Sequence, residues 1–304
     1  MNPDAAAPDP AAPAPADVAA AADRIRPYAR RTPLWRTEVD GRPLVLKLEH
    51  LQLTGSFKLR GALNALLTAE SPDRVVTASG GNHGLGVAEA ARQLGLPATV
   101  FVPVGAPEGK VRRIEAAGAK LIRHGETYAE AVLAAREAPG HYVEAYDSPA
   151  VVAGQGTVAA EVVADAPDVD AIAVAVGGGG LAAGTALGAA GRPVVAVEPE
   201  RCRALNRAFE AGRPVDTEVV SVAASALGAT RVGEVPFRVL RAHDVRSALV
   251  SDAELLAARD RLWEDFRLAV EPAAAVPFAA WLAGRVPGET ACVVLCGANT
   301  DWTP

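Results

Sequence analysis

Lys58 is the first residue of the chain whose surroundings suit covalent chemistry. It opens an expected helix inside the run TGSFKLRGA, residues 54–62. A glycine and the ring of Phe57 stand beside it and would shield the amine from water, which lowers the pKa of a lysine. A deprotonated lysine attacks carbonyl carbons, so Lys58 is a candidate Schiff-base residue. The competing interpretation is a lysine on a solvated helix face, the ordinary place for an isolated lysine.

A run of four glycines supplies a candidate phosphate site. Residues 177–180 follow an expected strand that ends at Val176, and they precede a helix expected from Leu181. Bare amides at a helix amino end attract an anion, and side chains there would block its approach. The run lacks the lysine of a Walker loop and the Rossmann spacing, so a flexible turn is the alternative. A phosphate site and a carbonyl-seeking lysine together suggest pyridoxal 5'-phosphate.

The elements that must position these residues alternate along the chain as in a wound α/β sheet. Short apolar, mostly β-branched runs predict buried parallel strands, and longer Ala-rich runs between them predict helices. The expected strands are 44–48, 74–77, 98–102, 120–123, 171–176, 194–198 and 291–295. The expected helices are 57–67, 84–94, 107–117, 128–136, 154–163, 181–190 and 252–266.

Glycine-rich turns follow three of these strands directly, at residues 79–84, 177–180 and 297–299. Such turns lie at the carboxyl ends of parallel strands, where open α/β folds bind ligands. Three of them predict one shared cleft. For the domains, we expect a disordered Ala/Pro tail over 1–17, a large domain formed by 18–72 and 148–304, and a small inserted α/β domain over 73–147.

The composition favours an enzyme that acts on small molecules. The chain has 304 residues and a net charge of −6, with its Lys and Arg scattered, so no basic patch marks a nucleic-acid or membrane partner. Cys202, Cys292 and Cys296 are too few and too irregularly spaced for a disulfide framework or a zinc site. The first seventeen residues lack the features of a signal peptide, and no apolar run is long enough to cross a membrane. We therefore expect a cytoplasmic protein.

Six blocks occur together along the chain: residues 54–62, 79–84, VVAGQGT at 151–157, 177–181, VEP at 270–272 and 295–301. In their order and spacing they resemble the threonine/serine dehydratase family of fold type II pyridoxal-phosphate enzymes, which also contains serine racemase. The resemblance covers nearly everything from residue 20 to the end. It implies a two-domain fold with pyridoxal 5'-phosphate in the cleft between the domains, and a homodimer.

The resemblance also implies roles for residues around the cofactor. Lys58 would carry the cofactor and then remove the α-hydrogen of the substrate. Cys296 would lie beside the pyridine nitrogen as a neutral, weak partner, which favours β-elimination over a long-lived carbanion; a small buried hydrophobe is the alternative for this cysteine. The implied cofactor-binding residues are Phe57, Lys58, Asn82, Gly177, Gly178, Gly179, Gly180, Leu181 and Cys296.

For the substrate, the resemblance implies that Ser79, Gly81, Asn82 and His83 clasp the carboxylate. The proton that lets hydroxide leave would come from the cofactor phosphate. His83 could instead act as a general acid, but shaping the turn is the better interpretation of it. Glu271 either contacts the cofactor region or ends a strand, and the second interpretation is slightly favoured.

The chain departs from the family pattern in several places. Serine racemase has a serine as its second acid/base where this chain has Gly80, which favours a lyase over a racemase. Relatives that bind a divalent cation use a glutamate and an aspartate; Glu198 matches the first, but Ala204 stands at the second, so we expect no metal there. Residues 221–228 differ from the usual stretch near the substrate. Because the chain stops just after Asp301, we expect no regulatory domain and no feedback control by isoleucine.

The function expected from all this is dehydration and deamination of L-threonine, L-serine or a close β-hydroxy amino acid such as 3-hydroxyaspartate, giving a 2-oxo acid and ammonia. β-Replacement, as in cysteine synthesis, is the second enzymatic interpretation. An amino-acid racemase, a pyridoxal-phosphate protein without turnover and a nucleotide binder are the remaining alternatives. A pyridoxal-phosphate protein is yellow and a nucleotide binder is colourless, so these two classes are easily separated.

Overall fold

The larger of two sheets organises most of the molecule. A computed structural model describes residues 12–300, and its six-stranded sheet is parallel except at one edge, where β1 pairs antiparallel with β2. In spatial order the strands are β1 (Leu34–Val39), β2 (Arg42–Lys47), β10 (Ala291–Val294), β7 (Ala171–Ala175), β8 (Val194–Pro199) and β9 (Val245–Val250). The last strand of the chain therefore lies in the middle of the sheet.

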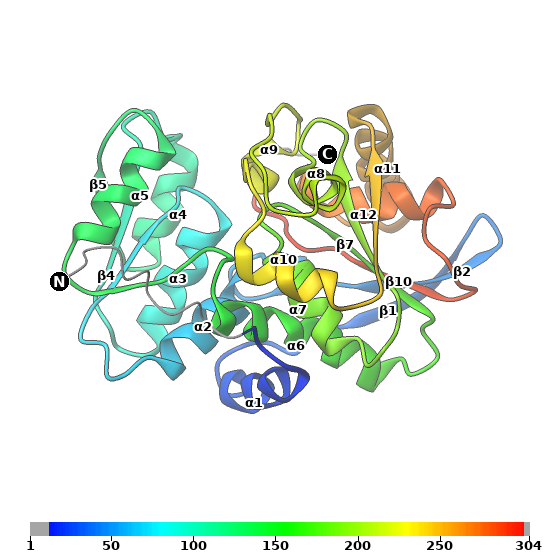
Figure 1. Cartoon of the computed structure of the whole chain (residues 1–304), viewed down its shortest axis with the longest axis horizontal. Coiled ribbons are helices and arrows are strands. Elements are labelled where there is room, and N and C mark those ends of the chain that lie inside the picture. Colours follow the sequence, from blue (N-terminus) through cyan, green and yellow to red (C-terminus); the bar gives the residue numbers. More distant parts are fainter. Residues whose placement is uncertain (1–11, 301–304) are drawn as a thin grey trace.

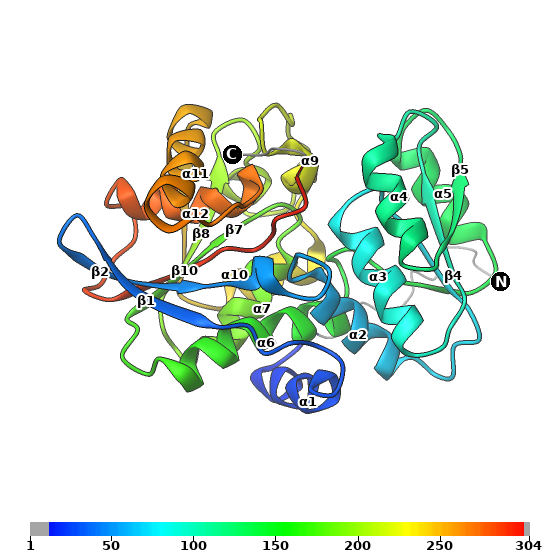
Figure 2. The same cartoon turned by 180° about the vertical axis from the view of Figure 1, so that it is seen from behind.

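Helices cover both faces of this sheet (Figures 1 and 2). α7 (Gly180–Gly188) packs on β7 and β8, with α6 (Pro149–Asp165) and α1 (Pro15–Ile25) beyond it, while α12 (Pro272–Leu282) packs on β7, β8, β9 and β10 and carries α11 (Asp252–Phe266). Covering both faces explains why the central strands are almost wholly apolar. Short helices complete this part: η1 (Glu49–Leu51), α8 (Ala204–Ala211), α9 (Ala224–Leu227) and α10 (Glu234–Arg241).

A smaller, wholly parallel sheet lies at the other end of the molecule (Figure 1). All four of its strands fall between residues 73 and 147, but its main apolar core also takes Leu59 and Leu63 from α2 (Lys58–Thr68) and Val151 from α6. A separate inserted domain with these limits stays a prediction. The strands are, in order, β5 (Lys120–Arg123), β4 (Ala98–Val102), β3 (Val75–Ala78) and β6 (His141–Tyr142), with helices α3 (Asn82–Gln93), α4 (Glu108–Ala116) and α5 (Tyr128–Glu137).

The disordered tail expected over residues 1–17 extends too far, because its last residues belong to a helix. Residues 1–11 lie outside the described part of the chain, but α1 already begins at Pro15. Proline suits the first turn of a helix, and the Asp17 carboxylate accepts the Ala14 N–H at 2.7 Å, so the last residues of the Ala/Pro run start a helix.

Seven strands and seven helices were expected, and each is present with ends that shift by a few residues at most. The largest shift is in α6, which begins at Pro149 and not at residue 154 because Ser148 caps it. The sequence did not reveal β1, β6, β9, α1, α8, α9, α10 or α12. Among residues 12–300, no helix is both long enough and apolar enough to span a membrane.

Candidate active site

Lys58 is the first residue of α2, at the boundary between the two sheets, and its side chain is partly buried. Its ammonium donates a hydrogen bond to the carbonyl oxygen of Ala145 at 2.9 Å and lies 5.3 Å from the ring centre of Phe57. Loss of water around the amine lowers the pKa of Lys58 to about 8, although the nearby Cys296 and Glu271 act in the opposite direction. The neutral form of this amine is therefore far more abundant near physiological pH than it is in an ordinary lysine.

The turn before Lys58 is joined to the turn after β10. The Phe57 N–H donates to the Cys296 carbonyl at 3.1 Å, the Ala298 N–H donates to the Gly55 carbonyl at 2.8 Å, and Ser56 forms a β-bridge with Gly297. Residues 55–57 and 296–298, which are far apart in the sequence, are thus joined by backbone contacts. This junction fixes the position of the lysine relative to Cys296.

The four-glycine run leads into α7 and has no room for side chains. A Cβ atom on Gly178 would lie 2.3 to 2.4 Å from ring atoms of Tyr146, and one on Gly179, whose φ is +93°, would lie 2.9 Å from Pro236. The loop backbone therefore packs closely against Tyr146 and Pro236. The first N–H groups of α7 have no partners within the helix and can receive an anion. Leu181 follows, buried against the core.

Tyr146 was missed by the sequence reasoning, although its place is informative. It follows Ala145, the carbonyl partner of Lys58, and its side chain covers Gly178 and Gly180. The next residue, Asp147, accepts the N–H groups of Glu234 and Val235 at the start of α10. The only signal in the sequence was a polar-aromatic segment just before the helix-starting pair Ser148-Pro149, which does not by itself predict these contacts.

Side-chain amides connect the turn of residues 79–83, here called the substrate turn after its predicted role, to the rest of the site. Asn299 Nδ2 donates to Asn82 Oδ1 at 2.7 Å, and Asn82 Nδ2 donates to Glu271 Oε1 at 2.8 Å. Asn299 Nδ2 also donates to the Thr54 carbonyl at 2.9 Å. The favoured interpretation of Glu271, as the end of a strand, is wrong: it is the residue before α12, and its carboxylate lies in the site.

His83 lies behind the substrate turn, within the first turn of α3, and is buried. Its Nε2 is 2.9 Å from Thr77 Oγ1 and 3.1 Å from the Val143 carbonyl. Burial, assisted by the charge of Lys58, lowers the pKa of His83 to about 3. The ring is therefore neutral at physiological pH. Its shaping role toward the turn stays a prediction.

One pocket lies beside the turn of residues 79–83, with an empty volume of about 340 Å³ that includes space open to solvent. It contains Gly81 and Asn82 of the expected substrate set, but neither Ser79 nor His83 is among its lining residues. Ser79 stays close by, since its Oγ accepts the Gly81 N–H at 3.2 Å. The described residues that line the pocket are Gly80, Gly81, Asn82, Leu85, Arg113, Ser225, Glu271 and Asn299.

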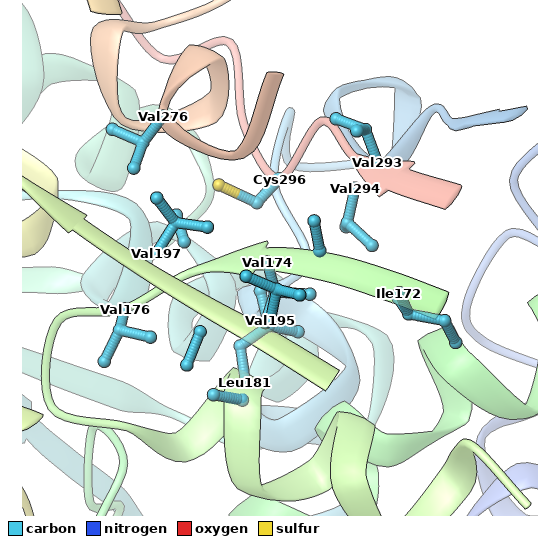
Figure 3. Close-up of a cluster of buried hydrophobic side chains, with 14 of the residues drawn as sticks. Ile172, Val174, Val176, Leu181, Val195, Val197, Val276, Val293, Val294 and Cys296 are labelled. Atoms are coloured by element: carbon cyan, nitrogen blue, oxygen red, sulfur yellow. The ribbon is translucent and has the colours of Figure 1, made fainter. Parts of the chain in front are cut away.

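Cys296 is almost completely buried, with 3% of its surface exposed. Figure 3 shows it among apolar side chains of the large core, which include Val174, Val197 and Val276. Burial first, and then the neighbouring Glu271, raise the pKa of the Cys296 thiol well above its ordinary value. The thiol is thus neutral, as a weak partner for a ring nitrogen would need to be. Its role toward the cofactor stays a prediction.

The carboxylate of Glu198 binds backbone N–H groups. Its two carboxylate oxygens accept the N–H groups of Leu205 and Asn206, each at 2.8 Å, at the start of α8. Burial raises the pKa of Glu198 to about 8. Among the described residues there is no group of three His, Cys, Asp or Glu side chains that could hold a metal ion.

Comparison with known proteins agrees with this geometry. A family model described as pyridoxal-phosphate dependent enzyme matches residues 25–297. The chain belongs to this family. An L-threonine ammonia-lyase of Geobacter sulfurreducens is 38% identical over 93% of this chain and 75% of its own length. A beta-hydroxyaspartate dehydratase of Paracoccus denitrificans is 33% identical over 94% of this chain and 96% of its own. The crystal structure of a T.th. threonine deaminase has a TM-score of 0.91 with 37% identity, covering 96% of this chain and 100% of that one.

These matches confirm the resemblance, the fold type II architecture and the cofactor of this pyridoxal-phosphate dependent enzyme. The residues present suit the cofactor. A loop without side chains opens a helix whose first amides can hold a phosphate. A partly buried lysine with a pKa of about 8 donates to the carbonyl of Ala145, the neighbour of the tyrosine that contacts this loop.

Proposed function

We propose that this enzyme removes water and ammonia from a small β-hydroxy amino acid, the class that includes L-threonine, L-serine and 3-hydroxyaspartate, to give a 2-oxo acid. The observation that carries the proposal is the amine of Lys58, whose pKa is lowered and which donates to the carbonyl of Ala145, the neighbour of the tyrosine that contacts the glycine loop. Lys58 also lies near Glu271, which lines the pocket together with residues 80–82. The printed activities of the relatives, threonine ammonia-lyase and beta-hydroxyaspartate dehydratase, support the same reaction class.

Pyridoxal phosphate, when bound, supplies a carbonyl for an amine and an electron sink for the carbon next to it. Lys58 would hold the cofactor through Nζ and later accept the proton from Cα of the substrate on the same atom. Gly177, Gly178, Gly179, Gly180 and Leu181 would bind the phosphate through backbone amides. Phe57 would pack beside the cofactor ring, Asn82 would donate to the ring hydroxyl, and Cys296 would stand at the ring nitrogen.

The turn of residues 79–83 would orient the substrate. We place the substrate carboxylate on Ser79, Gly81 and Asn82, where the amino end of α3 attracts an anion, while His83 supports the turn from behind. Gly80 lines the pocket without a side chain and so offers no proton to the face of Cα opposite Lys58. This favours elimination over racemisation.

We also propose that the enzyme is cytoplasmic, as its composition favours, and that it is a homodimer, as the family resemblance implies. Analytical ultracentrifugation of the purified, yellow protein tests the oligomeric state directly. A single species at the monomer mass at micromolar concentration would contradict it.

The experiment that tests the function is 2-oxo acid release from L-threonine, L-serine, their D-enantiomers and the stereoisomers of 3-hydroxyaspartate. Product from at least one L-configured β-hydroxy amino acid is expected. Borohydride reduction should fix the cofactor on Lys58, and peptide mapping identifies the modified residue. A yellow protein that releases no 2-oxo acid from any member of the panel would contradict the proposal and favour β-replacement.

A further inference from the structure

The segment of residues 145–147 lies between β6 and α6 and contacts three parts of the site. At its first residue, the carbonyl of Ala145 accepts the amine of Lys58 at 2.9 Å. Its second residue, Tyr146, packs on the glycine loop. Its third, Asp147, accepts two backbone N–H groups at the start of α10, at 2.8 and 3.1 Å. One short segment therefore links the reactive amine, the glycine loop and α10.

Both the ring and the backbone of Tyr146 contact the glycine loop. The ring atoms Cγ, Cδ1 and Cδ2 lie 2.3 to 2.4 Å from the position that a Cβ on Gly178 would take, so the ring fills the place of a side chain there. The Cβ, Cα and carbonyl oxygen of Tyr146 lie 3.1 to 3.3 Å from the corresponding position on Gly180. The Gly178 carbonyl also accepts the N–H of Gly233, just before α10, at 3.1 Å. The loop is therefore held by the ring and by the residue before α10.

The backbone amides of the glycine loop bind an anion best when their direction is already fixed. A run of four glycines has many accessible conformations and loses much entropy when it becomes ordered. Packing on the ring of Tyr146 orders the loop before an anion arrives, and such preorganisation increases affinity. The hydroxyl carries no charge in this contact, because burial, and then Asp147 and Glu144, raise the pKa of Tyr146. The ring is therefore the part of the side chain that orders the loop.

The same residue fixes the hydrogen-bond acceptor of the Lys58 amine. Ala145 directly precedes Tyr146, so the direction of its carbonyl depends on where the tyrosine ring is held. In the proposed function, Nζ of Lys58 accepts the proton from Cα of the substrate. A hydrogen bond from Nζ to a fixed carbonyl limits the position of the amine and the direction of its lone pair, and proton transfer depends on both.

We propose that Tyr146 is a positioning residue, which holds the glycine loop and the hydrogen-bond acceptor of Lys58 in one arrangement through the contact of its ring with Gly178. This inference rests on the proposed function and adds a residue to it. Loss of the ring is expected to weaken binding of the cofactor and to slow removal of the α-hydrogen. Loss of the hydroxyl alone is expected to do neither.

The first test measures the dissociation constant of pyridoxal phosphate from the absorbance of the bound cofactor, with circular dichroism to check that each variant is folded. Tyr146→Ala should raise this constant by about 10- to 100-fold, and Tyr146→Phe by less than about threefold. Tyr142→Ala is the matched control, because Tyr142 packs against a different apolar cluster and its ring lies 4.7 Å from the Arg136 guanidinium. It should also change the constant by less than about threefold. An unchanged constant in Tyr146→Ala, or an equal rise in either of the other two variants, would overturn the inference.

Gly178→Ala tests the same contact from the side of the loop. In the wild type the added Cβ meets the ring of Tyr146, so the dissociation constant of pyridoxal phosphate should rise by about 10-fold or more. In the Tyr146→Ala background the ring is absent, and Gly178→Ala should raise the constant by a clearly smaller factor. Equal factors in the two backgrounds would show that the contact does not order the loop and would overturn the inference.

The last test follows the amine, with the best substrate of the panel carrying hydrogen or deuterium at Cα. At saturating pyridoxal phosphate, Tyr146→Ala should lower kcat by about 10-fold or more and increase the isotope effect on kcat, because a misplaced base slows removal of the α-hydrogen. Tyr146→Phe should match the wild type. An unchanged kcat and isotope effect in Tyr146→Ala would overturn the inference. Failure of the proposed function would be seen separately, as a wild type that releases no 2-oxo acid while its affinity for the cofactor still depends on the ring of Tyr146.

Discussion

Lys47 and Lys58 lie close together in the sequence, but they differ in burial and in whether a carboxylate pairs with the amine. Lys47, at the end of β2, is 0% exposed, and its ammonium contacts the Glu161 carboxylate and the Thr32 carbonyl. Lys58 is partly buried and has only the Ala145 carbonyl as a hydrogen-bond acceptor; among the described residues it forms no ion pair. The ammonium of Lys47 thus has a carboxylate partner, whereas burial without such a partner lowers the pKa of Lys58.

The surroundings of Lys47 explain the difference. Arg60 lies close by with two carboxylates, Glu49 and Glu161, each 2.7 Å from a guanidinium nitrogen. Two cations and two anions therefore share one enclosed cluster and satisfy each other's charge. Such a cluster suits a structural role, since a buried charge needs a partner. A lysine without a carboxylate partner gives up its proton more easily and suits reaction with a carbonyl.

The largest expected effect comes from removing the reactive lysine. Lys58→Ala should lower 2-oxo acid formation by about 10⁴-fold or more, because the variant lacks both the group that holds the cofactor and the base. The measurement is steady-state turnover together with borohydride fixation of the cofactor. Lys47→Met is the control and should keep the fixation and most of the activity. A Lys58→Ala protein that still fixes the cofactor would show that a different lysine is the anchor.

Breaking the charged cluster should mainly affect stability. Arg60→Met leaves Glu49 and Glu161 without their shared cation and should lower the free energy of unfolding by about 3 to 5 kcal/mol. Urea unfolding of the apoprotein measures this. Arg261→Met removes an arginine from the more exposed carboxylates Asp40 and Asp265 and should cost at most about 1 kcal/mol. Equal losses in the two variants would mean that the buried cluster is not specially stabilising.

The pH dependence of stability should distinguish Lys58 from a paired lysine. Its pKa is about 8 in the folded apoprotein and near 10.5 when unfolded, so between these values the unfolded chain binds more protons. Stability contributed by this residue therefore rises with pH from about 8 to 10.5. Because water reaches the partly buried amine, we expect a gain of about 2 kcal/mol, less than the full difference in pKa implies. The difference in unfolding free energy between the wild type and Lys58→Met, measured across this range, should show the rise. A flat difference would place the pKa of Lys58 near its ordinary value.

The smallest expected effect concerns His83, another buried group without a countercharge. With a pKa of about 3, its ring stays neutral over the ordinary range of assay pH. The profile of kcat/KM between pH 5 and 7 should therefore contain no ionisation of His83. An inflection near pH 6 that disappears in His83→Gln would instead assign the ring a role in proton transfer.

The sequence predicted best those helices and strands whose local sequence signals match the structure that they form. α11 was expected with its observed ends because Ser251-Asp252 is a helix-start signal, and in the structure the Ser251 side chain caps this helix. The strands β4 and β5 were also expected with their observed ends. α12 was missed because it is apolar on all sides and contains Pro277, a pattern that does not favour a helix. β9 was missed because it is an edge strand with mixed burial.

The β1–β2 hairpin carried a signal that was not used. Asp40 and Gly41 both have positive φ, at 53° and 73°, as a two-residue hairpin turn requires, and Asp-Gly is typical of that turn. The reverse holds for the amide connection through Asn299, Asn82 and Glu271. These residues lie far apart along the chain, and only the packing of the two layers brings them together. No local pattern contains that information. The sequence therefore assigned Asn82 to the site, gave a contact with the cofactor region only as the less favoured interpretation of Glu271, and predicted no contact for Asn299.

The position of β10 has a consequence for how the protein is made. This strand lies between β2 and β7, and the turn after it supplies Cys296 and the backbone that bonds residues 55–57. During synthesis on the ribosome, the β1–β2 hairpin emerges long before β10, the strand that pairs with β2. Nascent chains and truncated products therefore lack a closed large sheet and the backbone junction beside Lys58, and binding of the cofactor marks a polypeptide whose synthesis has passed this last strand.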